Sequence, residues 1–128
     1  MDESTLSKSE AIEIAKAFVK KVLIKEDWYK KIESKVSAIL LYGSVAKAVN
    51  RSDSDIDLMI ILPIETEKAF TKGEYVIKYE GFEINIVLRS IEKLRTIDFI
   101  RDKFQKEVFR ESEFILENNA EVRSLLKR

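Results

Sequence analysis

Two short apolar runs constrain the fold of this chain more than any other feature. Residues 36–42 read VSAILLY, and residues 55–62 read DIDLMIIL. Gly43 breaks the first run and Pro63 ends the second. Short apolar runs bounded by such residues are typical of buried strands. We therefore predict two buried strands, over residues 36–42 and 55–62.

The chain before these strands is predicted to be helical. Apolar residues recur at three- and four-residue spacing as far as Leu23, which predicts an amphipathic helix to about residue 25. Ser7 or Ser9 can cap this helix, and Glu10 is placed to close a capping box on Ser7. A second short helix follows, with Asp27 as its cap.

The chain after these strands is predicted to form a hairpin and then helices. Residues 74–88, EYVIKYEGFEINIVL, read as two strands around Gly81. Ser90 can cap the next helix, and apolar residues at helical spacing predict a long helix from about residue 96 to about residue 117. Asn118 and Asn119 then break the chain before a short terminal helix. The predicted fold class is therefore α/β (α+β), with a small mixed sheet flanked by helices.

Composition limits the domain count, the location and the partners. The chain has 128 residues, of which 45% are hydrophobic, so we expect residues 1–128 to form a single folded domain. Lys plus Arg and Asp plus Glu both number 23, so the net charge does not indicate nucleic acid as the main partner. No apolar run approaches the length of a membrane span, and the N-terminus is acidic and polar. We therefore expect a cytoplasmic protein with no membrane association.

The chain contains neither cysteine nor histidine. Disulfides and thiolate metal sites are therefore excluded. The most common general base and the most common zinc ligand are also absent. Any chemistry must therefore use carboxylates, hydroxyls, lysine and arginine.

Two aspartates interrupt the second apolar run. Because side chains alternate along a strand, Asp55 and Asp57 leave the same face, with Cα atoms roughly 6.5–7 Å apart, while Ile56 and Leu58 point into the core. Two ionised carboxylates this close repel each other, and a cation between them removes that cost. Oxygen ligands without His or Cys favour Mg²⁺ or Mn²⁺.

A Gly-Ser pair supplies a place for phosphate groups near these aspartates. Gly43 follows the first strand and opens a predicted short helix over residues 44–49. Gly allows close backbone approach, and a helix N-terminus presents free N–H groups and the positive end of its dipole. The Ser44 hydroxyl can donate to a phosphate oxygen, and Lys47 can add a charge-assisted contact. If the two strands pair, residues 43–57 form a site for a metal–triphosphate.

The combined pattern is more specific than its parts. Asp-x-Asp alone more often caps a helix or lies in a solvated turn. With Gly, Ser and Asp each at about 5–7% of residues, G-S-x10-D-x-D is expected by chance in very roughly one chain of this size in several hundred. Residues 40–62, LLYGSVAKAVNRSDSDIDLMIIL, resemble the signature of the nucleotidyltransferase superfamily related to DNA polymerase beta, and within it the minimal nucleotidyltransferases.

This resemblance implies the nucleotidyltransferase fold and a set of residue roles. Gly43, Ser44 and Lys47 would bind nucleotide phosphates, and Asp55 and Asp57 would hold two divalent ions. Members of the family often have an arginine where this chain has Lys47. Lysine keeps the positive charge but lacks the forked, two-donor geometry of the guanidinium group.

The family also places a third acidic residue on a later strand, beside the aspartate pair. In FEINIVL, residues 82–88, that position falls on Asn85, which carries no charge and takes no proton. Glu83 shares a strand face with Asn85 and could replace the missing carboxylate as a metal ligand. Asp55, Asp57, Glu83 and Asn85 are thus the candidate catalytic residues.

The implied reaction is transfer of a nucleoside monophosphate, AMP from ATP or another NTP, to a hydroxyl acceptor with Mg²⁺ or Mn²⁺. By resemblance, the acceptor would be a tyrosine of a helical HEPN-type partner protein, with this chain as the antitoxin of a toxin–antitoxin pair. The alternatives are a non-catalytic module that binds such a partner and transfer to a small molecule such as an aminoglycoside. A homodimer is also an expectation, because a minimal core exposes sheet edges.

Overall fold

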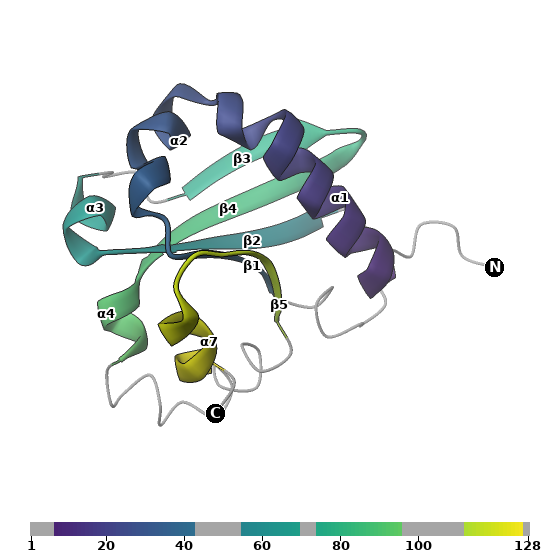
Figure 1. The fold of residues 1–128 in the computed structure, drawn as a ribbon. Helices are drawn as coiled ribbons and strands as arrows, with labels where there is room; N and C mark the ends of the chain where they lie inside the picture. The colour runs from purple at the N-terminus through teal and green to yellow at the C-terminus, as the bar shows by residue number, and fades with distance from the viewer. Residues whose placement is uncertain (1–6, 43–54, 70–73, 96–111, 127–128) are drawn as a thin grey trace.

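A five-stranded mixed sheet forms the centre of the computed structural model, which describes residues 7–42, 55–69, 74–95 and 112–126 (Figure 1). The strand order is β3-β4-β2-β1-β5. The strands are β1 (Ala38–Tyr42), β2 (Asp55–Leu62), β3 (Glu74–Tyr79), β4 (Phe82–Ser90) and β5 (Glu113–Glu117). The pair β2–β4 is parallel, and the other three pairs are antiparallel. The predicted fold class, a small mixed sheet flanked by helices, is confirmed.

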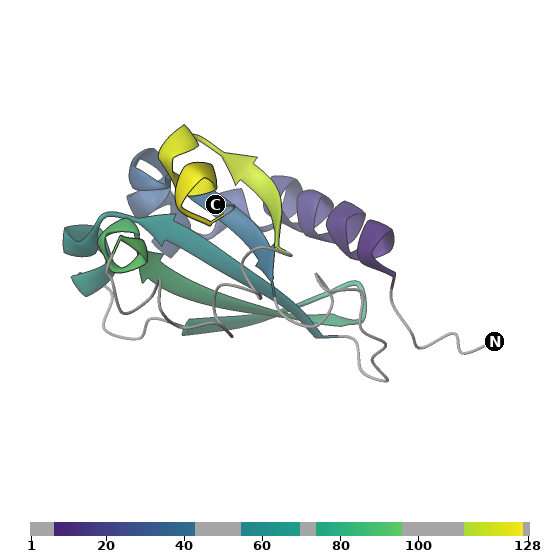
Figure 2. The same cartoon turned by 90° about the horizontal axis from the view of Figure 1, so that it is seen from below.

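Helices cover both faces of this sheet (Figures 1 and 2). On one face lie α1 (Lys8–Lys21), a 3₁₀ turn (Leu23–Lys25), α2 (Asp27–Ile32) and a second 3₁₀ turn (Glu33–Lys35). On the other face lie α4 (Ile91–Leu94) and α7 (Ala120–Leu126), and α3 (Ile64–Lys68) follows the end of β2. Of the helices that the structure describes, none combines the length and the apolar character needed to cross a membrane.

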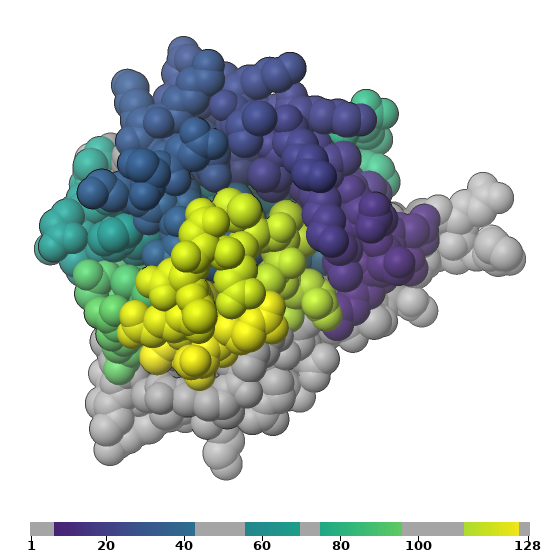
Figure 3. Space-filling view, in the orientation of Figure 1, coloured from purple at the N-terminus to yellow at the C-terminus, as the bar shows by residue number. Residues whose placement is uncertain are grey.

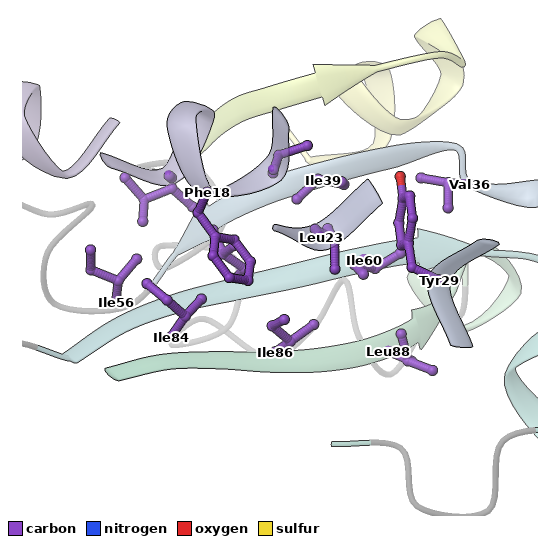
Figure 4. Close-up of a cluster of buried hydrophobic side chains, with 14 of the residues drawn as sticks. Phe18, Leu23, Tyr29, Val36, Ile39, Ile56, Ile60, Ile84, Ile86 and Leu88 are labelled. Carbon is purple, nitrogen blue, oxygen red and sulfur yellow. The ribbon is translucent and has the colours of Figure 1, made fainter. Parts of the chain in front are cut away.

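The larger core cluster lies under α1 and α2. Phe18, Leu23 and Tyr29 point from the helical layer onto the sheet, where every second residue of each central strand is buried (Figure 4). The sheet side chains of this cluster are Ile39, Leu41, Ile56, Leu58, Ile60, Leu62, Ile84, Ile86 and Leu88. Trp28 stacks on Tyr75 with ring centroids 4.0 Å apart, so both aromatic residues pack against this cluster.

A smaller cluster covers part of the opposite face. The alternate residues of β1 and β2 meet α4 and α7 there, and the buried members are Ala38, Leu40, Met59, Ile61, Ile91, Leu94 and Val122. Figure 3 shows the C-terminal segment β5–α7 beside α1 on one surface of the molecule, where Lys8 and Glu113 form an ion pair of 2.9 Å. The sheet is therefore buried on both faces along most of β1 and β2.

Local sequence signals account for several element ends. Ser7 accepts from the backbone N–H of Glu10, and the Glu10 side chain accepts from the backbone N–H of Ser7, which confirms the predicted capping box. The Ser90 hydroxyl accepts from the backbone N–H of Lys93 and so caps α4, as predicted. Glu80 and Gly81 both have positive φ, which is the pattern of a two-residue type I′ hairpin turn.

Four sequence predictions are wrong in part. The strand predicted over residues 36–42 begins at Ala38. The first helix ends at Lys21 instead of continuing to residue 25, because a 3₁₀ turn follows it. Asp27 is the first residue of α2, and its cap is Glu26, without a side-chain cap bond. The long helix predicted to residue 117 is contradicted at residues 113–117, which form β5 and pair with β1. The rest of that predicted helix, before residue 112, lies outside the described residues.

Candidate active site

The register of the parallel pair β2–β4 joins four of the predicted site residues in two cross-strand pairs, two residues apart along each strand. Asp55 is paired with Glu83, and Asp57 is paired with Asn85. The side-chain amide Nδ2 of Asn85 donates to Oδ1 of Asp57 at 3.3 Å. Residues paired across neighbouring strands project to the same face of a sheet. The fold thus brings Asp57 and Asn85 into contact, with Glu83 on the same face of β4.

Alternation along β2 and β4 explains why polar residues occur in these apolar strands. Ile56 and Leu58 are fully buried under α1, as predicted, so Asp57 between them projects to the opposite face. There Asp57 is half-buried. Farther along β2 on that same face, Met59 and Ile61 are buried against α4 and α7. The polar residues therefore occupy the beginning of both strands, where this apolar cluster ends.

β1 leads the chain directly to this position. Tyr42, the last residue of β1, is paired with Asp57 in the antiparallel pair β1–β2. The two apolar strands do pair, which is the condition on which the metal–triphosphate site was predicted. Gly43 and Ser44 come next in the sequence after Tyr42. Gly43, Ser44 and Lys47, together with the predicted helix over residues 44–49, lie outside the described residues.

Two residues near the site were missed at the level of sequence. Tyr42 was treated only as part of an apolar strand, although its register places it beside Asp57. Lys78 of β3 is paired with Glu83 of β4, on the other side of the site. A two-residue turn at residues 80–81 pairs residue 79 with 82 and residue 78 with 83, so the hairpin signal around Gly81 was sufficient to find Lys78.

The donor set at this position fits a hard divalent cation. Asp57 and Glu83 supply carboxylate oxygens, and Asn85 supplies an amide oxygen, which are the ligand types that Mg²⁺ and Mn²⁺ prefer. Among the described side chains, no three Asp or Glu residues lie close enough together to form a metal site by themselves. The Asp55 side chain is not among those described, although its backbone is paired with Glu83. Among the described side chains, Asp57, Glu83 and Asn85 are therefore the ones at this position that could ligate such an ion.

A family model and a solved structure are both similar to this chain. Residues 19–121 match the family model described as "Polymerase beta, Nucleotidyltransferase". The crystal structure of a nucleotidyltransferase-like protein from Exiguobacterium sibiricum has the same fold, with a TM-score of 0.55 and 12% sequence identity. The likeness covers 88% of this chain and 37% of that chain, so this chain spans little more than a third of that protein's length. No curated protein sequence matches the chain.

Proposed function

This chain belongs to the polymerase beta nucleotidyltransferase family, and from this premise we propose that it transfers a nucleoside monophosphate, AMP from ATP, to a hydroxyl acceptor. One observation carries the proposal. Asp57 and Asn85 are in contact, Glu83 shares their face, and Asp55 is paired with Glu83. Asp57, Glu83 and Asn85 thus supply oxygen donors near the end of β1, after which the sequence continues with Gly43 and Ser44.

The proposed roles of Asp55, Asp57 and Glu83 are supported by the register of β2 and β4, and those of Gly43, Ser44 and Lys47 by the resemblance of residues 40–62 to the family signature. Asp55, Asp57 and Glu83 hold Mg²⁺ or Mn²⁺. Bound there, the metal neutralises charge on the phosphates and on the attacking and leaving oxygens. Gly43, Ser44 and Lys47 hold the β- and γ-phosphates through backbone N–H groups, a hydroxyl and an ammonium group.

The transfer itself breaks one bond and forms one bond. The acceptor oxygen attacks the α-phosphorus of ATP, and the bond from that phosphorus to the oxygen bridging to the β-phosphate breaks. Pyrophosphate leaves with the bonding electron pair. Glu83 takes the hydroxyl proton, since the chain has no histidine to act as the base. Most of the acceleration then comes from positioning and charge stabilisation.

The resemblance of residues 40–62 to minimal nucleotidyltransferases supports a more specific acceptor. We propose a tyrosine of a HEPN-type helical partner, with this chain as the antitoxin that inactivates its partner by adenylylation. A homodimer is a further proposal of the same kind. The first proposal is tested by measuring binding and transfer to the partner protein, and the second by measuring the oligomeric state in solution.

Asn85 favours one alternative, a binding module without transferase chemistry. The Asn85 amide donates to Asp57, so the carboxylate already has a neutral partner at the position where the family has a third acid. A protein that had lost the reaction would keep the fold and could still bind and neutralise a helical partner. The two proposals differ in whether Asp57 is needed for transfer or only for local structure.

A transfer assay with Asp57→Asn separates the two proposals. The assay incubates the chain with radiolabelled ATP, Mg²⁺ or Mn²⁺ and the candidate partner, and measures label on the partner. Asp27→Asn is the matched control, because Asp27 is exposed at the start of α2 on the opposite face of the sheet. Transfer that is lost in Asp57→Asn and kept in Asp27→Asn supports the enzyme. Partner binding by all three proteins, without transfer by any, supports the binding module.

A further inference from the structure

The register of the hairpin extends the candidate site onto the edge strand β3. Lys78 is paired with Glu83, and Val76 is paired with Asn85. Two rows of side chains therefore cross the same face of the sheet. One row contains Asp57, Asn85 and Val76, and the other contains Glu83 and Lys78. The alternate residues of β3, Tyr75, Ile77 and Tyr79, pack on the opposite face in the larger core cluster. Val76 and Lys78 thus belong to the face of the candidate site.

Val76 and Lys78 are both exposed on this face. Val76 is 60% exposed, and Ile24 is the other exposed large hydrophobic residue described. Lys78 is exposed too, and within the described ranges no carboxylate forms an ion pair with it. An apolar side chain and an unpaired cation therefore lie in the open beside the half-buried Glu83 and Asn85.

The position of β3 assigns this part of the face to the acceptor. In the sheet order, β1 and β3 lie on opposite sides of the central pair β2–β4. The function proposed above places the triphosphate on the β1 side, where the chain continues into Gly43 and Ser44. An acceptor hydroxyl that attacks in line, opposite the leaving pyrophosphate, then approaches from the β3 side.

Lys78 determines which acceptor fits there. The carboxylates of Asp57 and Glu83 repel an anionic acceptor, and a nearby ammonium group offsets this repulsion. Among the strands that the structure describes, β3 lies at an edge of the sheet, so an extended peptide can pair with its outer backbone groups. A single lysine, in a chain with 23 basic and 23 acidic residues, is not the basic stripe that nucleic acid requires.

We propose that the acceptor is an acidic peptide segment with a hydroxyl side chain, which lies along β3 with an anionic group on Lys78. The inference rests on the proposed transferase function, because that function assigns the β1 side of the face to the triphosphate and the β3 side to the acceptor. Lys78 is a specificity residue in this account. It selects the acceptor through charge, and the exposed Val76 contacts the apolar part of the segment.

The test compares two short fluorescent peptides that carry one tyrosine flanked by either glutamates or glutamines. Binding is measured by anisotropy with Mg²⁺ and a non-hydrolysable ATP analogue present. The wild type should bind the glutamate peptide about fivefold more tightly, and the difference should shrink at high salt. Lys78→Gln should abolish the preference and Lys78→Arg should keep it. Lys20→Gln is the control, since Lys20 is exposed on α1 on the opposite face and should keep the preference.

Other outcomes overturn the inference. Equal binding of both peptides by the wild type, no binding of either, or an unchanged preference in Lys78→Gln would each contradict it. Thermal stabilisation by the ATP analogue, measured on the same samples, distinguishes failure of the acceptor inference from failure of the proposed function. If the analogue stabilises the protein and the preference is absent, only the acceptor inference fails. If the analogue has no effect on stability, the proposed function is contradicted, and so is the acceptor inference that depends on it.

Discussion

At the scale of single residues, the contact between Asp57 and Asn85 sets the charge of the candidate site. The Asn85 amide donates to the Asp57 carboxylate at 3.3 Å. A carboxylate at residue 85 would instead face Asp57 as a like charge and would need a cation between them. Asparagine therefore lets the metal-free protein tolerate the half-buried Asp57, at the cost of one negatively charged ligand.

Asn85→Asp should exchange stability in the metal-free state for metal affinity. Without a divalent cation, we expect the free energy of unfolding to fall by about 1–3 kcal/mol, because two carboxylates replace a hydrogen-bonded pair. Mg²⁺ or Mn²⁺ should restore most of the loss. Urea unfolding with EDTA and with each metal measures both effects. An unfolding free energy that does not depend on the metal in this variant would rule out a metal site at residues 57 and 85.

Tyr29 should make the fold sensitive to alkaline pH. Burial raises the pKa of Tyr29 from 10.0 to about 12, and the nearby Glu33 carboxylate adds to this rise. Tyr29 is 1% exposed in the core. Its neutral form therefore contributes fully to stability below pH 10. The contribution is lost as the pH rises from about 10 to about 12, because the unfolded chain releases the proton more readily.

The comparison with Tyr29→Phe isolates this effect. The wild type should lose up to about 2 kcal/mol of unfolding free energy relative to the variant between those two pH values. Unfolding monitored by circular dichroism at several alkaline pH values would measure the difference. If wild type and variant lose stability in parallel up to pH 12, the Tyr29 pKa is not raised in the folded protein.

At the scale of elements, the sequence predicted what local signals determine. β2 runs from Asp55 to Leu62, as its apolar run and Pro63 indicated. The hairpin predicted over residues 74–88 forms over residues 74–90, with Gly81 at a turn position that needs positive φ. These predictions rest on alternation and turn chemistry within a few residues of chain.

β5 shows where such reasoning fails. Residues 113–117 read EFILE, and apolar residues in a row fit a helix and a strand equally well. The structure uses both sides of the strand, because Phe114 packs in the smaller cluster while Ile115 and Leu116 pack against the larger one. The partner that selects the strand is β1, with Ala38 paired to Glu117. No local pattern contains a contact so distant in sequence.

In the candidate site too, local sequence features indicate some residues, while the placement of others depends on contacts between distant strands. The sequence indicated Asp57 and its neighbouring strand face, because a carboxylate within an apolar strand is a local feature. It also proposed Glu83 and Asn85, but only through resemblance to a family pattern. Their pairing with Asp55 and Asp57 depends on the parallel register of β2 and β4, which no spacing in the sequence determines.

The cap of α1 provides a test at this scale. Ser7→Ala should lower the free energy of unfolding by about 1 kcal/mol, because the backbone N–H of Glu10 loses its acceptor. Ser9→Ala is the matched control, since Ser9 is exposed within the first turn and alanine favours helices. Chemical denaturation of the three proteins would compare them. Equal destabilisation by both changes would contradict the assignment of Ser7 as the cap.

At the scale of the whole molecule, the two core clusters leave the site at one end of one sheet face. The larger cluster supports β2 and β4 from below, so the strands that carry Asp57 and Asn85 are rigid elements. The smaller cluster covers the other end of the site face, where α4 and α7 are joined by a two-bond ion pair between Arg95 and Glu121. The fold thus holds the polar residues in place, beside the exposed Val76 and Lys78 of β3.

The most direct test of this account is the thermal stability of the chain with Mg²⁺ or Mn²⁺ plus ATP, measured beside Asp57→Asn and the control Asp27→Asn. A ligand at one hundred times its Kd should add about 2.7 kcal/mol to the free energy of unfolding. We predict a metal-dependent upward shift of the melting temperature in the wild type and in Asp27→Asn, and its loss in Asp57→Asn. No shift with any nucleotide, or an equal shift in Asp57→Asn, would contradict a metal–nucleotide site at Asp57.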